Sequence, residues 1–463
     1  KQRKRKEEGI MQALQVVFQS ILDMGAAVFL PIIIFIIGLI VGLKPGKAIS
    51  AGLTLGVALT GINLVISYMS DTVGVAAQSF VENTGVQLTA LDMGWAPALG
   101  LCWSWKYAFV MFPVQIGINV IMLILGWTKT LNVDMWNVAN KIFTAFIVSS
   151  VTGSAVAGFV VAIAQIILEL KNGDATKNQI TELTGVPGVS MPHPMFLSNI
   201  FFYPFAKLLD KIPFFRYELN AQTLKQKIGI FGENHVLGFI VGTIVGLIGG
   251  QGVGALLTGV QAGTALTLFP MVSKLFMTAL TPISDAANEF IKKKFPGREM
   301  AIGLDWPILA GNPEIWVAII FTIPVALIVA MVLPGNTVLP FGNLMNVCVC
   351  AAAFVACKGN LLKMLATSYV MVPILCWSAS DFAPMLTDLA ISTGSSNILV
   401  DGQQLAWWGM DIAEIRWMIV EVLRGNIVGF GVLAIFIALA VYYFKAQKKE
   451  EHAVAVRMGW IEE

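Results

Sequence analysis

Long stretches without a single charged side chain dominate this sequence of 463 residues. Several of these stretches reach the roughly 18 residues that a membrane-spanning helix needs. They are Gly25 to Leu43, Ala48 to Ser70, Tyr107 to Thr128, Ile142 to Leu168 and Gly425 to Phe444. Val236 to Ser273 and Ile315 to Cys357 are each long enough for two crossings. Only 13% of the residues are charged, too few for the surface of a soluble protein of this size. Together with shorter apolar runs, this pattern predicts an all-α polytopic membrane protein with about ten or eleven crossings.

The charged and reactive residues exclude several other classes of protein. The net charge is +2, and no basic face interleaved with aromatic residues is present, so we expect no nucleic-acid partner. The five cysteines lie among apolar neighbours without metal-ligand spacing, which predicts neither a metal nor a cofactor. The basic start, KQRKRKEEG, precedes an apolar run that is too long for a signal peptide. No phosphate-binding loop is present either, so the energy for any transport must come from an ion gradient or a partner protein.

Two halves of the chain carry similar features in the same order. VGVAAQSF, which begins at Val73, resembles ISDAANEF, which begins at Ile283, although chance likeness between apolar sequences is an alternative explanation. A Gly-containing bend precedes each segment, and a stretch with Asp, Trp and Pro follows each one. A duplicated chain is typical of transporters whose substrate lies near the membrane midplane between the repeats. We therefore predict an amphipathic N-terminal segment (1–24), a first repeat (25–213), a linker loop (214–233), a second repeat (234–444) and a polar C-terminal tail (445–463).

The paired stretches LDMGWAPALG and GLDWPILAG place Asp92 and Asp305 between apolar runs. A carboxylate within a membrane costs roughly 3 kcal/mol by insertion scales, so it normally faces a cavity and has a function. The alternative is an interfacial carboxylate that caps a short helix. Trp95 could supply an apolar platform for the carbon face of a sugar, or belong to the aromatic belt at the membrane interface.

Other polar residues interrupt apolar sequence in a similar way. In SMPHPMF, two prolines hold the backbone around His193 extended, which is compatible with a catalytic role or with that of a buried structural histidine. Three further segments offer side-chain amides, one carboxylate and exposed backbone N–H groups. These groups suit a neutral ligand with many hydroxyl groups. These candidate substrate-binding residues are Asn137, Asn140, Asn312, Glu314, Gly359 and Asn360.

Five segments together resemble one known family. FGENHVLGFIVG, AIGLDWPILAGN, VLPGNTVLPFGNL, KGNLLKML and NVDMWN are similar to sequences of the galactitol-type membrane component, enzyme IIC, of the bacterial phosphoenolpyruvate phosphotransferase system. That family shares a superfamily with the ascorbate transporters, and the likeness covers nearly the whole chain. It implies a homodimer embedded in the lipid of the inner membrane. Each protomer would have about 11 transmembrane helices in two inverted repeats, each with a V-shaped helix pair and a core part.

The resemblance also implies a function, the uptake of a polyol such as galactitol coupled to its phosphorylation. A cytoplasmic IIB protein, itself supplied by IIA, would carry the phosphocysteine, so no residue of this chain should be phosphorylated. Sites carried over from the ascorbate transporters fall near Asp92 to Trp95, Asn137 to Lys141, His193, Asp305 and Lys358 to Asn360. We expect the two aspartates to orient the substrate. His193 would accept the proton of the reacting hydroxyl or hydrogen-bond it.

Departures from the galactitol pattern around the NPE segment and at Ala139–Asn140 leave a related polyol or sugar as another substrate. An ion-coupled transporter, with Asp92 and Asp305 as ion sites, is the alternative function. A passive channel fits the hydropathy but not the paired motifs. The stretches Gly25 to Ser70 and Val236 to Ser273 are rich in small residues, which predicts that they pack across the boundary between protomers.

Overall fold

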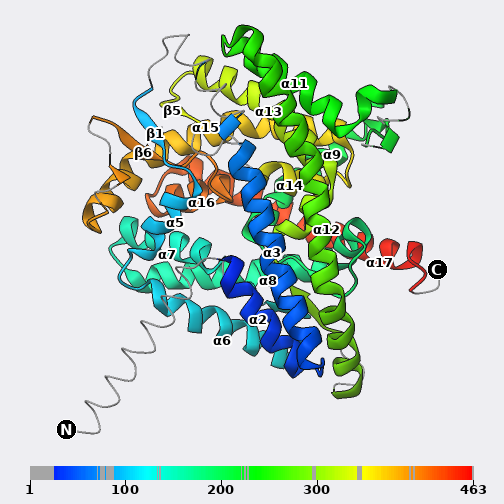
Figure 1. Ribbon diagram of the computed structural model, residues 1–463. Helices are drawn as coiled ribbons and strands as arrows, with labels where there is room; N and C mark the ends of the chain where they lie inside the picture. The colour runs from blue at the N-terminus through cyan, green and yellow to red at the C-terminus, as the bar shows by residue number, and fades with distance from the viewer. Residues whose placement is uncertain are drawn as a thin grey trace.

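The computed structural model describes residues 26–69, 88–132, 134, 137–220, 229–294, 299–340, 347–395 and 402–460, with a few isolated positions between these ranges. Most of the described residues lie in helices, and the exceptions include two small sheets (Figure 1). The predicted N-terminal segment 1–24 lies outside the described residues. The predicted polar tail is helical as far as Arg457, because α17 (Ile427–Arg457) continues through it.

Two helical hairpins cross the molecule. The first joins α2 (Ala26–Ile40) to α3 (Pro45–Met69), and the second joins α11 (Asn234–Ile248) to α12 (Ala255–Lys294). Helices α3 and α12 pack side by side (Figure 1). A V-shaped helix pair in each half, which the sequence resemblance implies, stays a prediction.

Glycines allow the two helices of the second hairpin to approach closely. A Cβ atom added at Gly238 would lie 2.6 Å from the Cα of Gly263, and one at Gly242 would lie 2.6 Å from the Cβ of Ala262. Such small residues let helix backbones come together in a membrane. These glycines therefore serve contacts within one chain, and packing across a protomer boundary stays a prediction.

Four described helices are long and apolar enough to cross a membrane. They are α8 (Ala155–Thr184), α13 (Pro313–Val332), α15 (Leu361–Ser392) and α17. A bent pair is a fifth candidate, in which α5 (Trp95–Trp103) leads through η2 (Ala108–Val110) into α6 (Met111–Ile124) with a bend of 86°. The polytopic helical class is thus confirmed for the described residues, while the number of eleven helices stays a prediction.

Two of the charge-free runs are interrupted in the structure. The run Ile142 to Leu168 does not form one helix, because Gly153 adopts a φ of 70° and ends α7 (Val138–Thr152). Ser154 then caps α8 by accepting a hydrogen bond from the amide of Ala157 at 3.3 Å. The run Ile315 to Cys357, predicted to be long enough for two crossings, contains α13 and, after β5 (Val338–Leu339), α14 (Val347–Ala356). Both interruptions arise where a left-handed glycine or a Pro/Gly-rich turn breaks apolar sequence.

Two parallel three-stranded sheets exchange strands between the halves of the chain. In the first sheet, β1 (Ala90–Asp92) lies between β5 and β6 (Gln404–Ala406). In the second, β4 (Ala301–Gly303) lies between β2 (Thr130–Asn132) and β3 (Val189–Ser190). Each half therefore gives its first strand to a sheet whose other strands come from the opposite half. Since parallel strands end at the same edge, the segments that follow them are brought together there.

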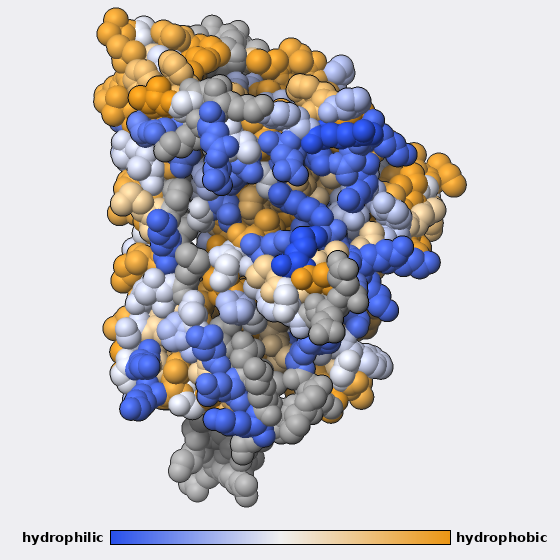
Figure 2. Space-filling view, turned by 90° about the vertical axis from the view of Figure 1, so that its right-hand side faces the viewer, coloured by the Kyte–Doolittle hydropathy of each residue, from blue (hydrophilic) through white to orange (hydrophobic). Residues whose placement is uncertain are grey.

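Hydrophobic side chains cover much of the outer surface, as expected for a protein in contact with lipid. Leu53, Val57 and Leu64 on α3 are each more than 60% exposed. Figure 2 shows the face on which α17 ends, and hydrophilic residues gather across its middle.

A charged group outside the membrane-spanning helices lies at the start of β4. There the Glu299 carboxylate accepts hydrogen bonds from Lys129 at 2.8 Å and from Lys177 at 2.7 Å. The hydrogen bonds from these two lysines lower the pKa of Glu299 to about 2.

Candidate functional site

His193 and Asp305 meet where the second sheet ends. Asp305 follows β4 by two residues and His193 follows β3 by three, so both leave the same edge of the sheet. His193 Nε2 lies 3.3 Å from Asp305 Oδ1, and the side chains are only 4% and 14% exposed. Oδ1 of Asp305 also accepts a hydrogen bond from the amide of Trp306 at 2.6 Å, which fixes the carboxylate at the start of η7 (Trp306–Gly311).

The hydrogen bonds of His193 define which ring nitrogen carries the proton. Nδ1 accepts a hydrogen bond from the amide of Met195 at 3.2 Å. A neutral imidazole bonded in this way carries its proton on Nε2, the atom that faces Asp305. In this arrangement His193 is a hydrogen-bond donor, held in place by the proline-flanked turn that the sequence singled out.

The segment NVDMWNVAN reaches the same place from β2. Asp134 accepts hydrogen bonds from both the amide and the side chain of Asn137, the former at 3.3 Å. Asn137 Oδ1 accepts a hydrogen bond from Asn140 Nδ2 at 3.3 Å, and the Asn137 side chain lies near the Asp305 carboxylate. Four sequence-predicted residues, Asn137, Asn140, His193 and Asp305, are therefore brought into one polar cluster.

Two residues of this cluster were not predicted from the sequence. Asn140 Nδ2 donates to Asp411 Oδ2 at 2.9 Å, and a terminal nitrogen of Arg416 donates to the Asn140 carbonyl at 2.9 Å and to its Oδ1 at 3.0 Å. Both charged residues come from the end of the second half, more than 270 positions away. The segment GMDIAEIRW, which holds two acids and an arginine after a buried Trp–Trp pair, is the sequence signal that could have indicated them.

A buried ion pair lies next to the cluster and contacts its backbone at Asn137. Lys141 Nζ lies 2.5 Å from Glu169 Oε2, and the two side chains are 0% and 1% exposed. Lys141 also donates to the Asn137 carbonyl at 3.2 Å, and Gln165 donates to Glu169 at 2.8 Å. The pair joins the first turn of α7 to the middle of α8.

Asp92 and Trp95 occupy a different environment. Asp92 is the last residue of β1, whereas Asp305 lies two residues beyond β4, so the two aspartates are not at equivalent positions of their strands. Asp92 Oδ1 accepts hydrogen bonds from the amides of Gly94 at 3.3 Å and Trp408 at 3.1 Å. Trp95 begins α5 and is 41% exposed.

A small cavity of about 30 Å³ lies next to Asp305. Asp134 is the second carboxylate among its lining residues, and the expectation that Asp92 and Asp305 together orient the substrate stays a prediction. A cavity of this volume has room for about one water molecule. This cavity is therefore too small for a polyol in this conformation.

The remaining predicted residues stabilise the ends of helices. Asn312 donates to the Leu309 carbonyl at 2.9 Å, and Glu314 lies in the first turn of α13. Gly359 has a φ of 73°, and a Cβ there would lie 3.2 Å from the Phe354 ring. Asn360 caps α15 by accepting from the amide of Lys363 at 3.3 Å, and it donates to the Tyr217 carbonyl at 2.9 Å. These contacts give each residue a structural task, and binding of substrate by them stays a prediction.

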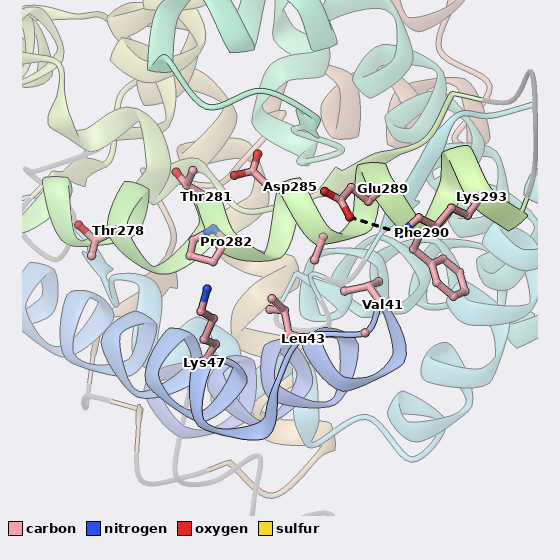
Figure 3. A pocket seen from close by; sticks show the side chains of 12 residues that line it. Val41, Leu43, Lys47, Thr278, Thr281, Pro282, Asp285, Glu289, Phe290 and Lys293 are labelled. Carbon is pink, nitrogen blue, oxygen red and sulfur yellow. Dashed lines mark ion pairs between the residues drawn. The ribbon is translucent and has the colours of Figure 1, made fainter.

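A much larger pocket, of about 990 Å³, opens between the α2–α3 turn and the second half of α12. In Figure 3, Lys47 from α3 and Asp285 and Glu289 from α12 lie around it, and Glu289 is ion-paired with Lys293. Leu280, which precedes the lining residue Thr281 on α12, belongs to the small cavity beside Asp305. Neighbouring residues of one helix thus border both the large open pocket and the small cavity. Within the described ranges, no group of three or more His, Cys, Asp or Glu side chains is arranged to hold a metal ion.

Comparison with known proteins identifies relatives over most of the chain. The family model described as "PTS system sugar-specific permease component" matches residues 20–398. The galactitol-specific EIIC component of the phosphotransferase system from Escherichia coli K12 is 34% identical over 422 residues, which cover 89% of this chain and 92% of the relative. A putative permease IIC component of the same organism is 32% identical over 443 residues, or 94% of this chain and all of the relative.

Proposed function

This chain belongs to the galactitol-type family of sugar-specific permease components, EIIC, of the phosphotransferase system, and from that premise we propose that it carries galactitol into the cell while a partner IIB protein phosphorylates it. The family and the apolar helices make it a multi-pass membrane protein. The bacterial inner membrane is the location that this coupling requires, because phosphorylated IIB and IIA are cytoplasmic. The substrate assignment rests on the relative named for galactitol.

The observation that carries the proposal is the composition of the buried cluster. Asp134, Asp305 and Asp411 provide acceptors, and the amides of Asn137 and Asn140 provide both donors and acceptors. A polyol is neutral and presents many hydroxyl groups, each able to donate to a carboxylate and accept from an amide. An anionic substrate would meet like charges instead. The cluster therefore suits a neutral polyol.

In this proposal the reacting hydroxyl group binds between the side chains of His193 and Asp305. A hydroxyl inserted between them would accept a hydrogen bond from Nε2 of His193 and donate its own proton toward the Asp305 carboxylate. During transfer, the P–S bond of the IIB phosphocysteine breaks, the P–O bond to the substrate forms, and the hydroxyl proton passes to the carboxylate acting as general base. Of the two roles expected for His193, this arrangement supports the one as hydrogen-bond donor. The 3.3 Å contact must open before a hydroxyl can enter.

The fold supports a duplicated architecture for this transport. The two halves, 25–213 and 234–444, act as inverted repeats, each beginning with a helical hairpin and exchanging its first strand with the other half. In this proposal α3 and α12 lie at the centre of a homodimer, and the core segments that hold Asp305 and His193 move relative to them. Such movement would open the closed cavity to one side of the membrane at a time.

Uptake by the purified protein in liposomes tests the function. Radiolabelled galactitol should enter and emerge as galactitol phosphate when phosphoenolpyruvate, IIA and IIB are present, and uptake should survive collapse of proton and sodium gradients. Uptake driven by an ion gradient without phosphoenolpyruvate would refute the proposal in favour of a secondary transporter.

Three variants connect the function to the cluster. Asp305→Asn should weaken galactitol binding in calorimetry while the protein still folds and dimerises. His193→Ala should reduce phosphorylation more than binding. Asp381→Asn is the matched control, because this carboxylate is 42% exposed and does not belong to the cluster. Its ion-pair partner is Arg424, at 3.5 Å. Normal galactitol binding in Asp305→Asn would remove Asp305 from the site.

A further inference from the structure

We propose that Asp411 is a further substrate-binding residue, whose carboxylate oxygen Oδ1 accepts a hydrogen bond from a hydroxyl group of the polyol. This inference rests on the proposed function and deepens it. It assigns a direct ligand contact to the end of the second half, in the segment that follows β6.

The two carboxylate oxygens of Asp411 differ in their surroundings. Oδ2 accepts a hydrogen bond from Asn140 Nδ2 at 2.9 Å. Oδ1 is fully buried and has no hydrogen-bond partner among the described residues. The residue as a whole is only 4% exposed. A buried acceptor on a charged group is costly to leave unsatisfied, so a ligand that donates to it at some stage of the cycle is the straightforward explanation.

Arg416, the nearest cation on the same segment, is already engaged. Its Nε donates to Thr144 Oγ1 at 3.0 Å, one terminal nitrogen donates to the Asp411 carbonyl at 2.7 Å, and the other donates to Asn140. The guanidinium also lies 4.9 Å above the Phe143 ring. Because Arg416 would have to give up these bonds to reach Oδ1, we assign it a positioning role and leave Oδ1 to the substrate.

The backbone next to Asp411 is held in an unusual conformation. Ile412 has a φ of 46° and a ψ of 39°, in the left-handed region that a β-branched residue rarely adopts. Such conformations persist where the surrounding structure imposes them, and they concentrate at binding sites. Ile412 immediately precedes α16 (Ala413–Leu423), and Asp411, the residue before it, accepts the hydrogen bond from Asn140.

Asp411 also belongs to the same electrostatic group as the proposed reaction centre. Its charge acts on both His193 and Asp305. The other carboxylate oxygens there are largely engaged, since both oxygens of Asp134 accept from Asn137, and Asp305 Oδ1 accepts from Trp306 and faces His193. Asp411 Oδ1 is therefore an acceptor that the cluster keeps available for a ligand.

Calorimetry with galactitol and a series of its monodeoxy analogues tests this contact. Asparagine at 411 can still accept from Asn140 through its amide oxygen, but it offers no carboxylate to the substrate. Asp411→Asn should weaken galactitol binding about 10- to 100-fold, the size expected for a hydrogen bond to a charged group. It should leave unchanged the affinity for the one deoxy analogue that lacks the contacted hydroxyl. Asp381→Asn again serves as the control, with unchanged affinity throughout.

Each other outcome has a definite meaning. Equal affinity of wild type and Asp411→Asn for galactitol overturns the proposal. An equal loss for galactitol and every deoxy analogue also overturns it, because Asp411 would then act only by positioning Asn140. If Asp411→Asn does not fold, Asp411→Glu keeps the charge and should shift the pattern of preferred analogues, and an unchanged pattern overturns the contact. Wild-type protein that binds no polyol at all refutes the proposed function itself, and the ligand assigned to Asp411 with it.

Discussion

The buried pair between Lys141 and Glu169 permits a quantitative test of how the candidate site is supported. The perturbation is a pair of single substitutions, Lys141→Met and Glu169→Gln, together with the double variant. Both side chains are essentially inaccessible to solvent, at 0% and 1% exposure. The first residue also donates to the Asn137 carbonyl, so the pair is connected directly to the polar cluster.

The expected magnitude follows from the separation and the burial. At 2.5 Å and an effective dielectric constant of about 20, the attraction is roughly 7 kcal/mol. Desolvation costs several kcal/mol for each ion, so the intact pair contributes little net stability. Either single substitution leaves one charge buried without its partner and should cost about 3–5 kcal/mol. The double variant removes both charges and should lose at most about 2 kcal/mol, so the two effects are strongly non-additive.

The free energy of unfolding in mixed detergent micelles, followed by circular dichroism, measures this cycle. Glu289 and Lys293 provide a matched control, because they form an ion pair at 3.6 Å with side chains 75% and 77% exposed. Their variants should change the free energy by less than about 0.5 kcal/mol. Additive losses of about 1 kcal/mol or less at Lys141 and Glu169 would refute the reasoning, since they would mean that water reaches the pair.

Three further predictions concern other parts of the structure. Gly303→Ala places a Cβ 2.8 Å from a proline side chain and should cost about 1–3 kcal/mol in thermal unfolding, whereas Gly117→Ala, with no atom within 4 Å, should be neutral or stabilising. Asn360→Ala should cost about 1 kcal/mol by loss of the α15 cap. If Asn360 also binds substrate, the same variant should lose galactitol affinity about tenfold, and unchanged affinity would leave Asn360 only the capping role. Hydrogen bonds from Lys129 and Lys177 lower the pKa of Glu299 from 4.5 to about 2. The ionised carboxylate therefore stabilises the folded state above pH 4.5, and this contribution is lost as the pH falls toward 2. Glu299→Gln should therefore lose less stability than wild type between pH 5 and pH 3 in thermal scans, and identical pH profiles would contradict this.

The sequence by itself determined the class of protein and half of the polar cluster. Charge-free runs longer than 18 residues leave no alternative to membrane-spanning helices, since lipid cannot satisfy exposed backbone amides. His193 and Asp305 were identifiable because polar and charged side chains are costly within apolar sequence. The two prolines beside His193 marked it further. The same local reasoning misassigned the break at Gly153, because a single glycine in an apolar run is compatible with a continuous helix until its φ is known.

Only the tertiary structure decided which of these residues meet. Asp92 and Asp305 have similar sequence surroundings, yet Asp92 ends its strand and Asp305 lies two residues beyond its strand. As a result Asp92 accepts a hydrogen bond from the amide of Trp408, whereas Asp305 contacts His193. Asp411 and Asn140 are 271 positions apart, and no local pattern indicates that they share a hydrogen bond. Their contact joins the start of α7 to the residues just before α16, and such long-range pairing is fixed by packing of the whole chain, not by the composition of either segment.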